Sequence, residues 1–158
     1  MTRLTFTIEI LESPGHVWAF FVPQRMPYWY GAEMEAEFEV QGGASDFAVG
    51  QKVRIIGRVL RCEVALTAVI TRCEPRRVLE WKFRDKYGIR GTQRWEIAPA
   101  VPASDGEVRR ARVTLHEEFE LPEKGRLARL AERFWMRPSV ARRDRLHLAK
   151  LKQLAERA

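Results

Sequence analysis

The sequence predicts an α+β domain in which a seven-stranded, curved antiparallel sheet wraps around a long C-terminal helix, with two short helices between the first two strands. Two observations lead to this prediction. Segments in which apolar and polar side chains alternate recur as far as residue 119, and this two-residue period is typical of strands with one buried and one solvated face. An apolar stripe with helical spacing then runs from about residue 123 to the end of the chain.

The alternation places the strands in order. Residues 4–10 form the first, and residues 33–40 are expected to form the second, because four glutamates alternate there with apolar residues and would all point to solvent. Arg54 on the third strand is then expected to pair with one of these glutamates and to fix the register. The remaining strands are expected at residues 52–58, 62–71, 79–84, 89–97 and 111–119.

The helices are delimited by capping residues and prolines. Ser13 is a suitable N-cap and Pro14 suits the first helical position, so a short helix should run to about Phe21. Another turn or two is expected within residues 24–30. In the last helix, Pro138 lacks a backbone donor and crowds the preceding turn, which predicts a kink.

Length and composition favour one domain over residues 1–158, since 46% of the residues are hydrophobic. No segment approaches the roughly eighteen consecutive apolar residues of a membrane span, so a cytoplasmic protein is expected. Cys62 and Cys73 would lie at opposite ends of the fourth strand, too far apart to bridge, and are expected to be reduced. No metal or cofactor is predicted, and the chain is expected to be a monomer or homodimer.

The net charge of +7 is located in the last helix. Residues 122–158 contain eleven lysines and arginines against four acids, and the rest of the chain is balanced. A solvated helix surface accounts for such a pattern. The functional alternatives are an anionic lipid surface, an acidic partner or RNA, whereas DNA is not expected.

Small residues recur on the inward side of the strands, namely Ala36, Gly57, Ala68, Gly91 and Ala111. Side chains of this size leave space beneath a crossing helix and therefore indicate an internal pocket. The alternative is that the glycines only allow the sheet to bend, and both interpretations can hold together.

Several local phrases carry a resemblance: Ile8-Glu9-Ile10 before Ser13-Pro14 and Val17-Trp18, Val49-Gly50, residues 74–81 (EPRRVLEW), Trp95-Glu96-Ile97, and the terminal helix through Leu148 to Leu154. Together they resemble the START-like, or SRPBCC, superfamily, which includes polyketide cyclases and dehydrases and lipid-transfer domains. The resemblance covers nearly the whole chain and implies a helix-grip fold with an apolar pocket between the sheet and the last helix. It implies no particular activity, because one such cavity serves carriers, sensors and enzymes.

Polar residues on the inward side of the strands are the candidate catalytic residues. Glu117 is a candidate acid or base, because a carboxylate in an apolar cavity without a cation has a raised pKa, and Gln93 would orient a carbonyl. The alternative is that Glu117 pairs with Arg137 or a loop arginine, or that a bulge turns it outward. The expected ligand-binding residues are apolar: Phe38, Trp81, Phe83, Trp95, Phe119, Leu130, Phe134 and Trp29.

Two further features have open interpretations. Residues 28–31 are expected to form either a flexible lip of the pocket or a hydrophobic plug that closes one end. Asp144 and His147 lie three residues apart on the last helix and are expected to bond to each other along its inner edge.

The sequence is compatible with three functions. The first is binding, for transport, storage or sensing, of a hydrophobic small molecule such as a lipid, polyketide or isoprenoid. The second is a polyketide cyclase or dehydratase that uses the carboxylate in the cavity. The third is a basic helix that binds RNA or anionic lipid. The sequence leaves the ligand, and whether any reaction is catalysed, open.

Overall fold

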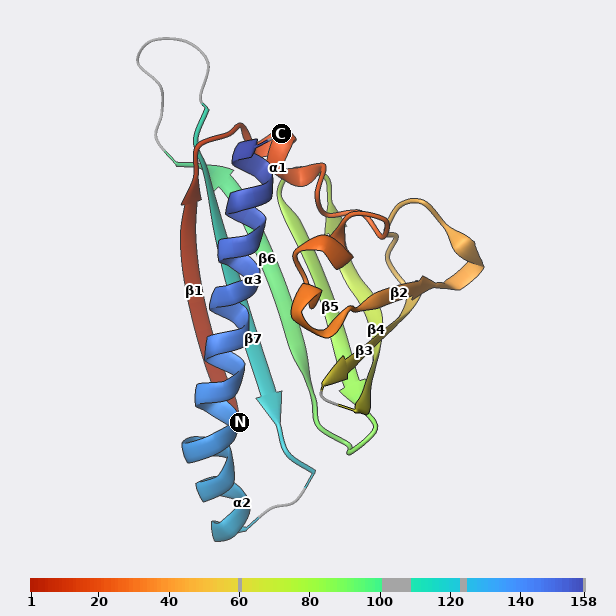
Figure 1. Cartoon of the computed structure of the whole chain (residues 1–158), viewed down its shortest axis with the longest axis vertical. Coiled ribbons are helices and arrows are strands. Elements are labelled where there is room, and N and C mark those ends of the chain that lie inside the picture. The colour runs from red at the N-terminus through yellow and green to blue at the C-terminus, as the bar shows by residue number, and fades with distance from the viewer. Residues whose placement is uncertain (60, 101–108, 123–124, 158) are drawn as a thin grey trace.

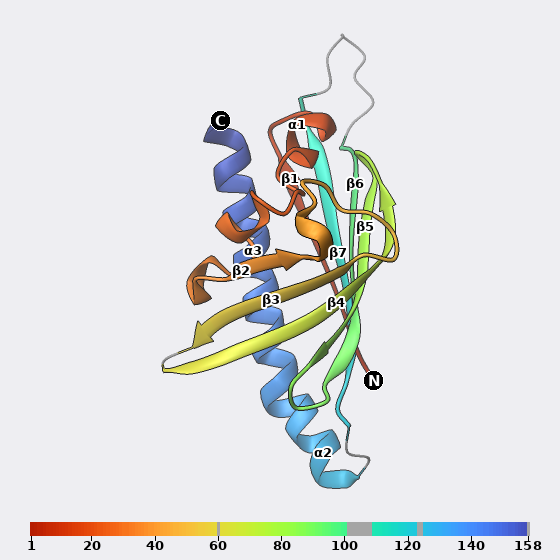
Figure 2. The same ribbon diagram turned by 90° about the vertical axis from the view of Figure 1, so that its right-hand side faces the viewer.

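A computed structural model describes residues 1–59, 61–100, 109–122 and 125–157. The sheet is antiparallel and seven-stranded, with the order β1-β7-β6-β5-β4-β3-β2. It bends so that β2, β3 and β4 cross the long helix α3, which lies along β1 and β7 (Figures 1 and 2). The expected helix-grip fold is therefore confirmed. No helix in the described ranges is long and apolar enough to cross a membrane.

The strands lie close to their expected positions, apart from β2. They are β1 (Thr2–Ile10), β2 (Glu37–Val40), β3 (Lys52–Val59), β4 (Cys62–Glu74), β5 (Val78–Asp85), β6 (Arg90–Pro99) and β7 (Ala111–Glu120). Glu39 pairs with Arg54 across β2 and β3 at 3.9 Å, as the charge pattern predicted. Cys62 and Cys73 are free thiols at the two ends of β4.

The short helices lie between β1 and β2. Helix α1 (Pro14–Trp18) is capped by the Ser13 side chain, which accepts a hydrogen bond from the His16 amide. Single 3-10 turns follow at η1 (Met26–Tyr28) and η2 (Ala32–Met34), and another, η3 (Gln41–Gly43), follows β2. Trp29 is fully buried, so this part of the segment is a hydrophobic plug rather than a lip.

The second strand is shorter than predicted, and the error has a local cause. Residues 32–34 form the turn η2, and both Gly31 and Glu35 adopt left-handed backbone conformations at φ 75° and 50°. Met34 packs onto Gly57, where an added Cβ would lie 2.9 Å from the Met34 Cβ. Met34 of this turn therefore fills the space beside Gly57. Glu33 lies in the turn η2 and is not part of the sheet.

The C-terminal helix consists of α2 (Arg126–Ala131), a π-helical turn η4 (Glu132–Met136) and α3 (Arg137–Arg157). The sequence predicts a kink at Pro138; the structure has a π-helical turn that ends two residues before it, and α3 runs through Pro138. A proline cannot donate to the carbonyl four residues earlier, and a π turn changes the hydrogen-bonding pattern at that place. The far end of α3 is held by contacts with the start of the chain, including Lys152 Nζ donating to the Glu9 carbonyl at 2.8 Å.

Gly91 marks a close approach of strands. It lies between Phe83 on β5 and Phe119 on β7 in the sheet register. A Cβ there would lie 2.0 Å from the Glu118 carbonyl oxygen and 2.8 Å from the Phe83 ring. Because a backbone atom stands in the way, only glycine fits without movement of a strand.

We therefore predict that Gly91→Ala lowers the free energy of unfolding by about 3 kcal/mol, because overpacking against backbone forces the strands apart. Urea unfolding followed by circular dichroism measures this. Gly125→Ala is the matched control, since an added Cβ at Gly125 meets nothing within 4 Å. Equal losses in both variants would contradict the steric explanation.

Candidate functional site

A cavity of about 90 Å³ lies between the sheet and the C-terminal helix. Most of its lining is apolar, from Val64, Leu66, Phe83, Ile89, Phe119, Met136 and Val140. Five polar side chains also line it, namely Tyr30, Asp85, Gln93, Glu117 and Arg143. Cavities of this composition bind apolar molecules and orient them by a few polar contacts.

Glu117 faces the cavity because alternation along β7 places it on the same side as Leu115 and Phe119. Its side chain is 1% exposed, and Oε1 lies 3.2 Å from an Arg143 guanidinium nitrogen. The expectation of a cavity without a cation is therefore wrong, and the pairing arginine is Arg143 rather than Arg137. Glu117 Oε2 and Arg143 Nε have no hydrogen-bond partner among the described residues.

Asp144 lies beside this ion pair and is fully buried. The pKa of Asp144 is raised to about 10. Burial is the main cause, the neighbouring Glu117 carboxyl acts in the same direction, and Arg143 opposes the shift. Asp144 therefore keeps its proton at neutral pH. Its Oδ1 lies 3.9 Å from Arg143 Nε, beyond hydrogen-bond distance.

Gln93 is fixed by two donors on its carbonyl oxygen. The Tyr30 hydroxyl donates to Oε1 at 2.9 Å, and the Trp81 indole donates to the same atom at 2.8 Å. Burial raises the pKa of Tyr30, so its hydroxyl stays protonated. With Oε1 doubly occupied, the amide nitrogen is the donor that Gln93 has left to offer in the cavity.

His147 on α3 contacts residues 30–33, the segment that leads into the turn η2. Its Nε2 lies 2.9 Å from Glu33 Oε1 and 3.1 Å from the Gly31 amide nitrogen, and its ring is 4.7 Å from that of Tyr30. Burial lowers the pKa of His147, while the Glu33 contact acts in the opposite direction. The expected bond between Asp144 and His147 is replaced by these contacts to the turn η2.

Of the eight residues predicted for ligand binding, two line the cavity. Phe83 and Phe119 line the cavity, and Trp81 contacts Gln93 above it. Trp29 and Trp95 pack against each other deeper in the core, with Phe38 half-buried against Tyr30 and Trp81. By contrast, Leu130 and Phe134 are 51% and 61% exposed and do not line this cavity.

The polar residues of the site that were not predicted as site residues include Tyr30, Arg143, Asp144 and His147. A signal for two of them was present, because Asp144 and His147 fall four and seven residues after Val140 and share its buried helix face. Polar residues inside an apolar stripe indicate a buried polar site.

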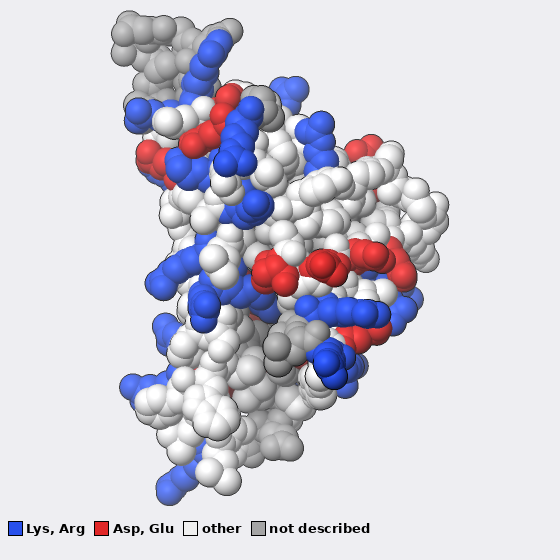
Figure 3. All heavy atoms as spheres, viewed as in Figure 1, with Lys and Arg blue, Asp and Glu red and all other residues white. Residues whose placement is uncertain are grey.

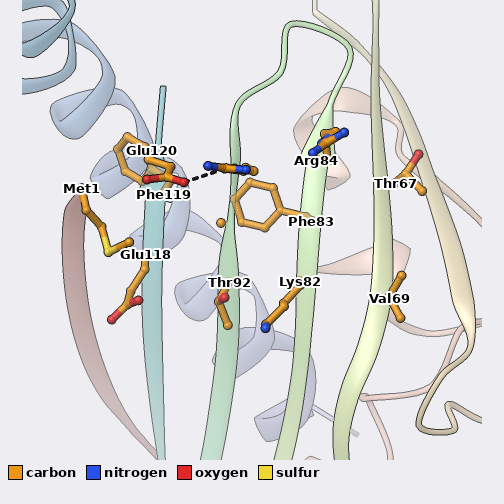
Figure 4. A pocket seen from close by; sticks show the side chains of 12 residues that line it. Met1, Thr67, Val69, Lys82, Phe83, Arg84, Thr92, Glu118, Phe119 and Glu120 are labelled. Carbon is orange, nitrogen blue, oxygen red and sulfur yellow. Dashed lines mark hydrogen bonds and ion pairs between the residues drawn. The ribbon is translucent and has the colours of Figure 1, made fainter. Parts of the chain in front are cut away.

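A larger depression, of about 600 Å³, lies on the solvent side of the sheet (Figure 4). Its rim carries charges of both signs, and Arg90 there is paired with Glu120. Among its lining residues, all of which the structure describes, the buried ones are Phe83 and Phe119, and none is a buried polar group. The internal cavity is therefore the better candidate site.

The protonated state of Asp144 has a measurable consequence. Between its ordinary pKa of 3.8 and about 10, the folded state holds a proton that the unfolded chain has released, so wild-type stability falls as pH rises through that window. Asp144→Asn should remove this dependence. We expect the variant to gain on the wild type by up to about 1.4 kcal/mol per pH unit between about pH 5 and 9.

Urea unfolding of both proteins across that range measures the difference. The exposed Asp46→Asn serves as the control and should track the wild type. A constant difference between Asp144→Asn and the wild type at all pH values would show that Asp144 is ionised in the folded state.

Several solved structures share this fold. The chain is similar to an aromatase/cyclase from a Streptomyces species, at 16% identity and a TM-score of 0.72 over 99% of this chain and 94% of that one. It is also similar to a protein from Arthrobacter aurescens (18%, 0.72, covering 99% and 87%) and one from Chromobacterium violaceum (16%, 0.66, covering 98% and 96%). At these identities the similarity shows the fold alone.

Among curated proteins, none matches the sequence. A family described as polyketide cyclase / dehydrase and lipid transport matches residues 1–156. The match spans every element that builds the cavity, from β1 to α3. The chain therefore belongs to the polyketide cyclase / dehydrase and lipid transport family of START-like proteins.

Proposed function

We propose that the protein binds a hydrophobic small molecule, such as a lipid, polyketide or isoprenoid, between the sheet and α3. The observation that carries this proposal is the internal cavity, which is lined by seven apolar and five polar side chains. Membership of a family described by both cyclisation and lipid transport supports the class of ligand.

The polar groups indicate which end of the ligand they hold. Arg143 Nε and Glu117 Oε2 have no hydrogen-bond partner among the described residues, and buried polar atoms are rarely left without one. The Gln93 amide nitrogen is a further donor, because its side-chain oxygen already accepts from Tyr30 and Trp81. A carbonyl oxygen on the ligand would accept from Arg143 and Gln93, and a hydroxyl could in addition donate to Glu117 Oε2. Its apolar part would contact Phe83, Phe119 and Val140.

The size of the cavity sets a further condition. About 90 Å³ holds only a few water-sized groups, so a lipid or polyketide enters only if α3 and the sheet move apart. The lining comes from both sides of that junction, with Met136 and Val140 on the helix and Leu66 and Phe83 on the strands.

Filling the cavity should abolish binding. Val140 is buried in the lining, so Val140→Phe occupies the space that a ligand needs. We expect the variant to bind the apolar dye Nile red at least about tenfold more weakly than the wild type, measured by fluorescence titration.

Leu146→Phe is the matched control, since Leu146 is 51% exposed on the same helix. It should bind Nile red as the wild type does. Undiminished binding by Val140→Phe, with its circular dichroism spectrum intact, would place the dye elsewhere and count against the cavity.

A second candidate function is catalysis of an aldol-type cyclisation or dehydration. The observation that favours it is the buried pair of carboxyl groups beside one arginine, with a proton retained on Asp144. Glu117 would take a proton from a carbon next to a carbonyl while Arg143 stabilises the negative charge on that carbonyl oxygen. In a dehydration, the β-hydroxyl group then leaves with a proton as water.

This candidate predicts that Glu117→Gln lowers turnover of a linear poly-β-keto thioester by about a hundredfold or more, because the amide cannot accept the proton. Glu118→Gln is the matched control: the neighbouring residue points to the solvent side of the same strand. Product formation is followed by mass spectrometry. Equal turnover by both variants would remove Glu117 from the reaction, and no turnover by the wild type would leave the binding function.

A further inference from the structure

The α2 end of the C-terminal helix carries an exposed apolar surface. Leu127, Leu130, Phe134 and Trp135, here called the α2 patch, are 83%, 51%, 61% and 77% exposed. The first three follow one another at the spacing of a single helix face. They are exposed because α2 extends beyond the end of the sheet that α3 crosses (Figures 1 and 2).

The helix is turned so that this surface faces away from the protein. The half-buried residues of the segment are Ala128, Ala131, Glu132 and Met136, so the side toward the sheet carries two small residues, an acid and, at its far end, the methionine that lines the cavity. Glu132 is held there by the hydroxyl of Thr2, which donates to it. Large apolar groups are therefore presented to solvent while alanines face the core, the reverse of an ordinary surface helix.

Arginines border the α2 patch. Arg126, Arg129, Arg133 and Arg137 are all exposed, and Glu132 is the one acid among residues 125–137. In Figure 3 this lower end of the molecule shows a mainly white surface with blue side chains at its edges. Arg133 also lies over the Phe134 ring at 5.7 Å.

We propose that the α2 patch docks onto the surface of an anionic lipid bilayer. A helix with leucine and aromatic residues on one side and arginines beside them lies in the bilayer interface, where apolar groups enter the acyl boundary and guanidinium groups contact lipid phosphates. Tryptophan favours that interface because its ring is apolar and its N–H is polar. The long arginine side chains reach past the apolar residues to the headgroups.

Charge distinguishes this occupant from a second copy of the chain. A symmetric contact through the α2 patch would bring the arginines of both copies together, and within residues 125–137 of each copy the one acid, Glu132, is turned toward Thr2. A bilayer containing acidic lipid supplies the missing negative charge.

The docking surface adjoins the cavity. Met136 ends the π turn and lines the cavity, while Phe134 and Trp135 in the same turn belong to the α2 patch. A bilayer held against these residues would lie next to the part of the helix that must move to admit a ligand. The residues of the α2 patch do not line the cavity, so the patch could bind a bilayer whether or not the cavity binds a ligand.

The test is co-sedimentation of the full chain with vesicles of phosphatidylcholine mixed with phosphatidylglycerol, and with vesicles of phosphatidylcholine alone. We expect binding to the mixed vesicles only, weakened by salt. Arg126→Gln/Arg129→Gln/Arg133→Gln should weaken it about a hundredfold, since each basic residue near an anionic surface contributes about fivefold. Phe134→Ser/Trp135→Ser should abolish it.

Two controls carry changes of the same kind outside the α2 patch. Arg58→Gln/Lys82→Gln/Arg84→Gln removes three exposed charges from the sheet, and Leu146→Ser removes an exposed leucine from α3; both should bind as the wild type does. Trp135 is the exposed tryptophan among five, so brominated lipid in the mixed vesicles should quench its fluorescence.

Several outcomes would overturn the proposal: equal binding to both kinds of vesicle, equal loss in the control variants, or binding of RNA in place of vesicles. Dimerisation that Phe134→Ser/Trp135→Ser abolishes, without vesicle binding, would assign the α2 patch to self-association. Nile red binding should be unchanged in the patch variants, so failure at the membrane is separable from failure of the cavity.

Discussion

The contact between Arg143 and Glu117 is the constraint on which the rest of the site depends. It joins α3 to β7 at the centre of the fold, with Glu117 1% exposed. The Arg143 side chain is 36% exposed, so the buried partner is Glu117, and removing Arg143 would leave that carboxylate as an uncompensated buried charge. The pair therefore fixes how α3 lies on the sheet, and it places Asp144, one residue along, against the same carboxylate.

The electrostatics of the site follow from one cation being shared by two carboxyl groups. Arg143 balances one negative charge, so Asp144, which is fully buried beside Glu117, holds its proton. Burial likewise keeps Tyr30 protonated and available to donate to Gln93. The cavity thus combines fixed donors, one carboxylate and one stored proton in an apolar enclosure. These groups could orient the polar head of a ligand, and they could also transfer a proton to or from it.

Strand alternation was sufficient to predict the sheet, and with it the inward side chains of Gln93 and Glu117. It failed at residues 33–36, where the alternation continues although Gly31 and Glu35 turn the backbone into η2. Spacing along a helix also could not tell which arginine meets Glu117, because that depends on where the helix crosses the strand. The exposure of Leu130 and Phe134 depends on where the sheet ends, which a helical stripe does not encode.

The π turn accounts for a pattern that a regular helix would not give. One extra residue in a helical turn rotates everything beyond it by about 100°, so the apolar stripe of α2 does not continue the buried face of α3. The face of α3 that begins at Val140 grips the sheet, while Leu127, Leu130 and Phe134 point outward. Pro138 favours the irregularity at this place because it removes a donor from the turn. The C-terminal helix therefore presents apolar residues to the sheet along α3 and to solvent along α2 and η4.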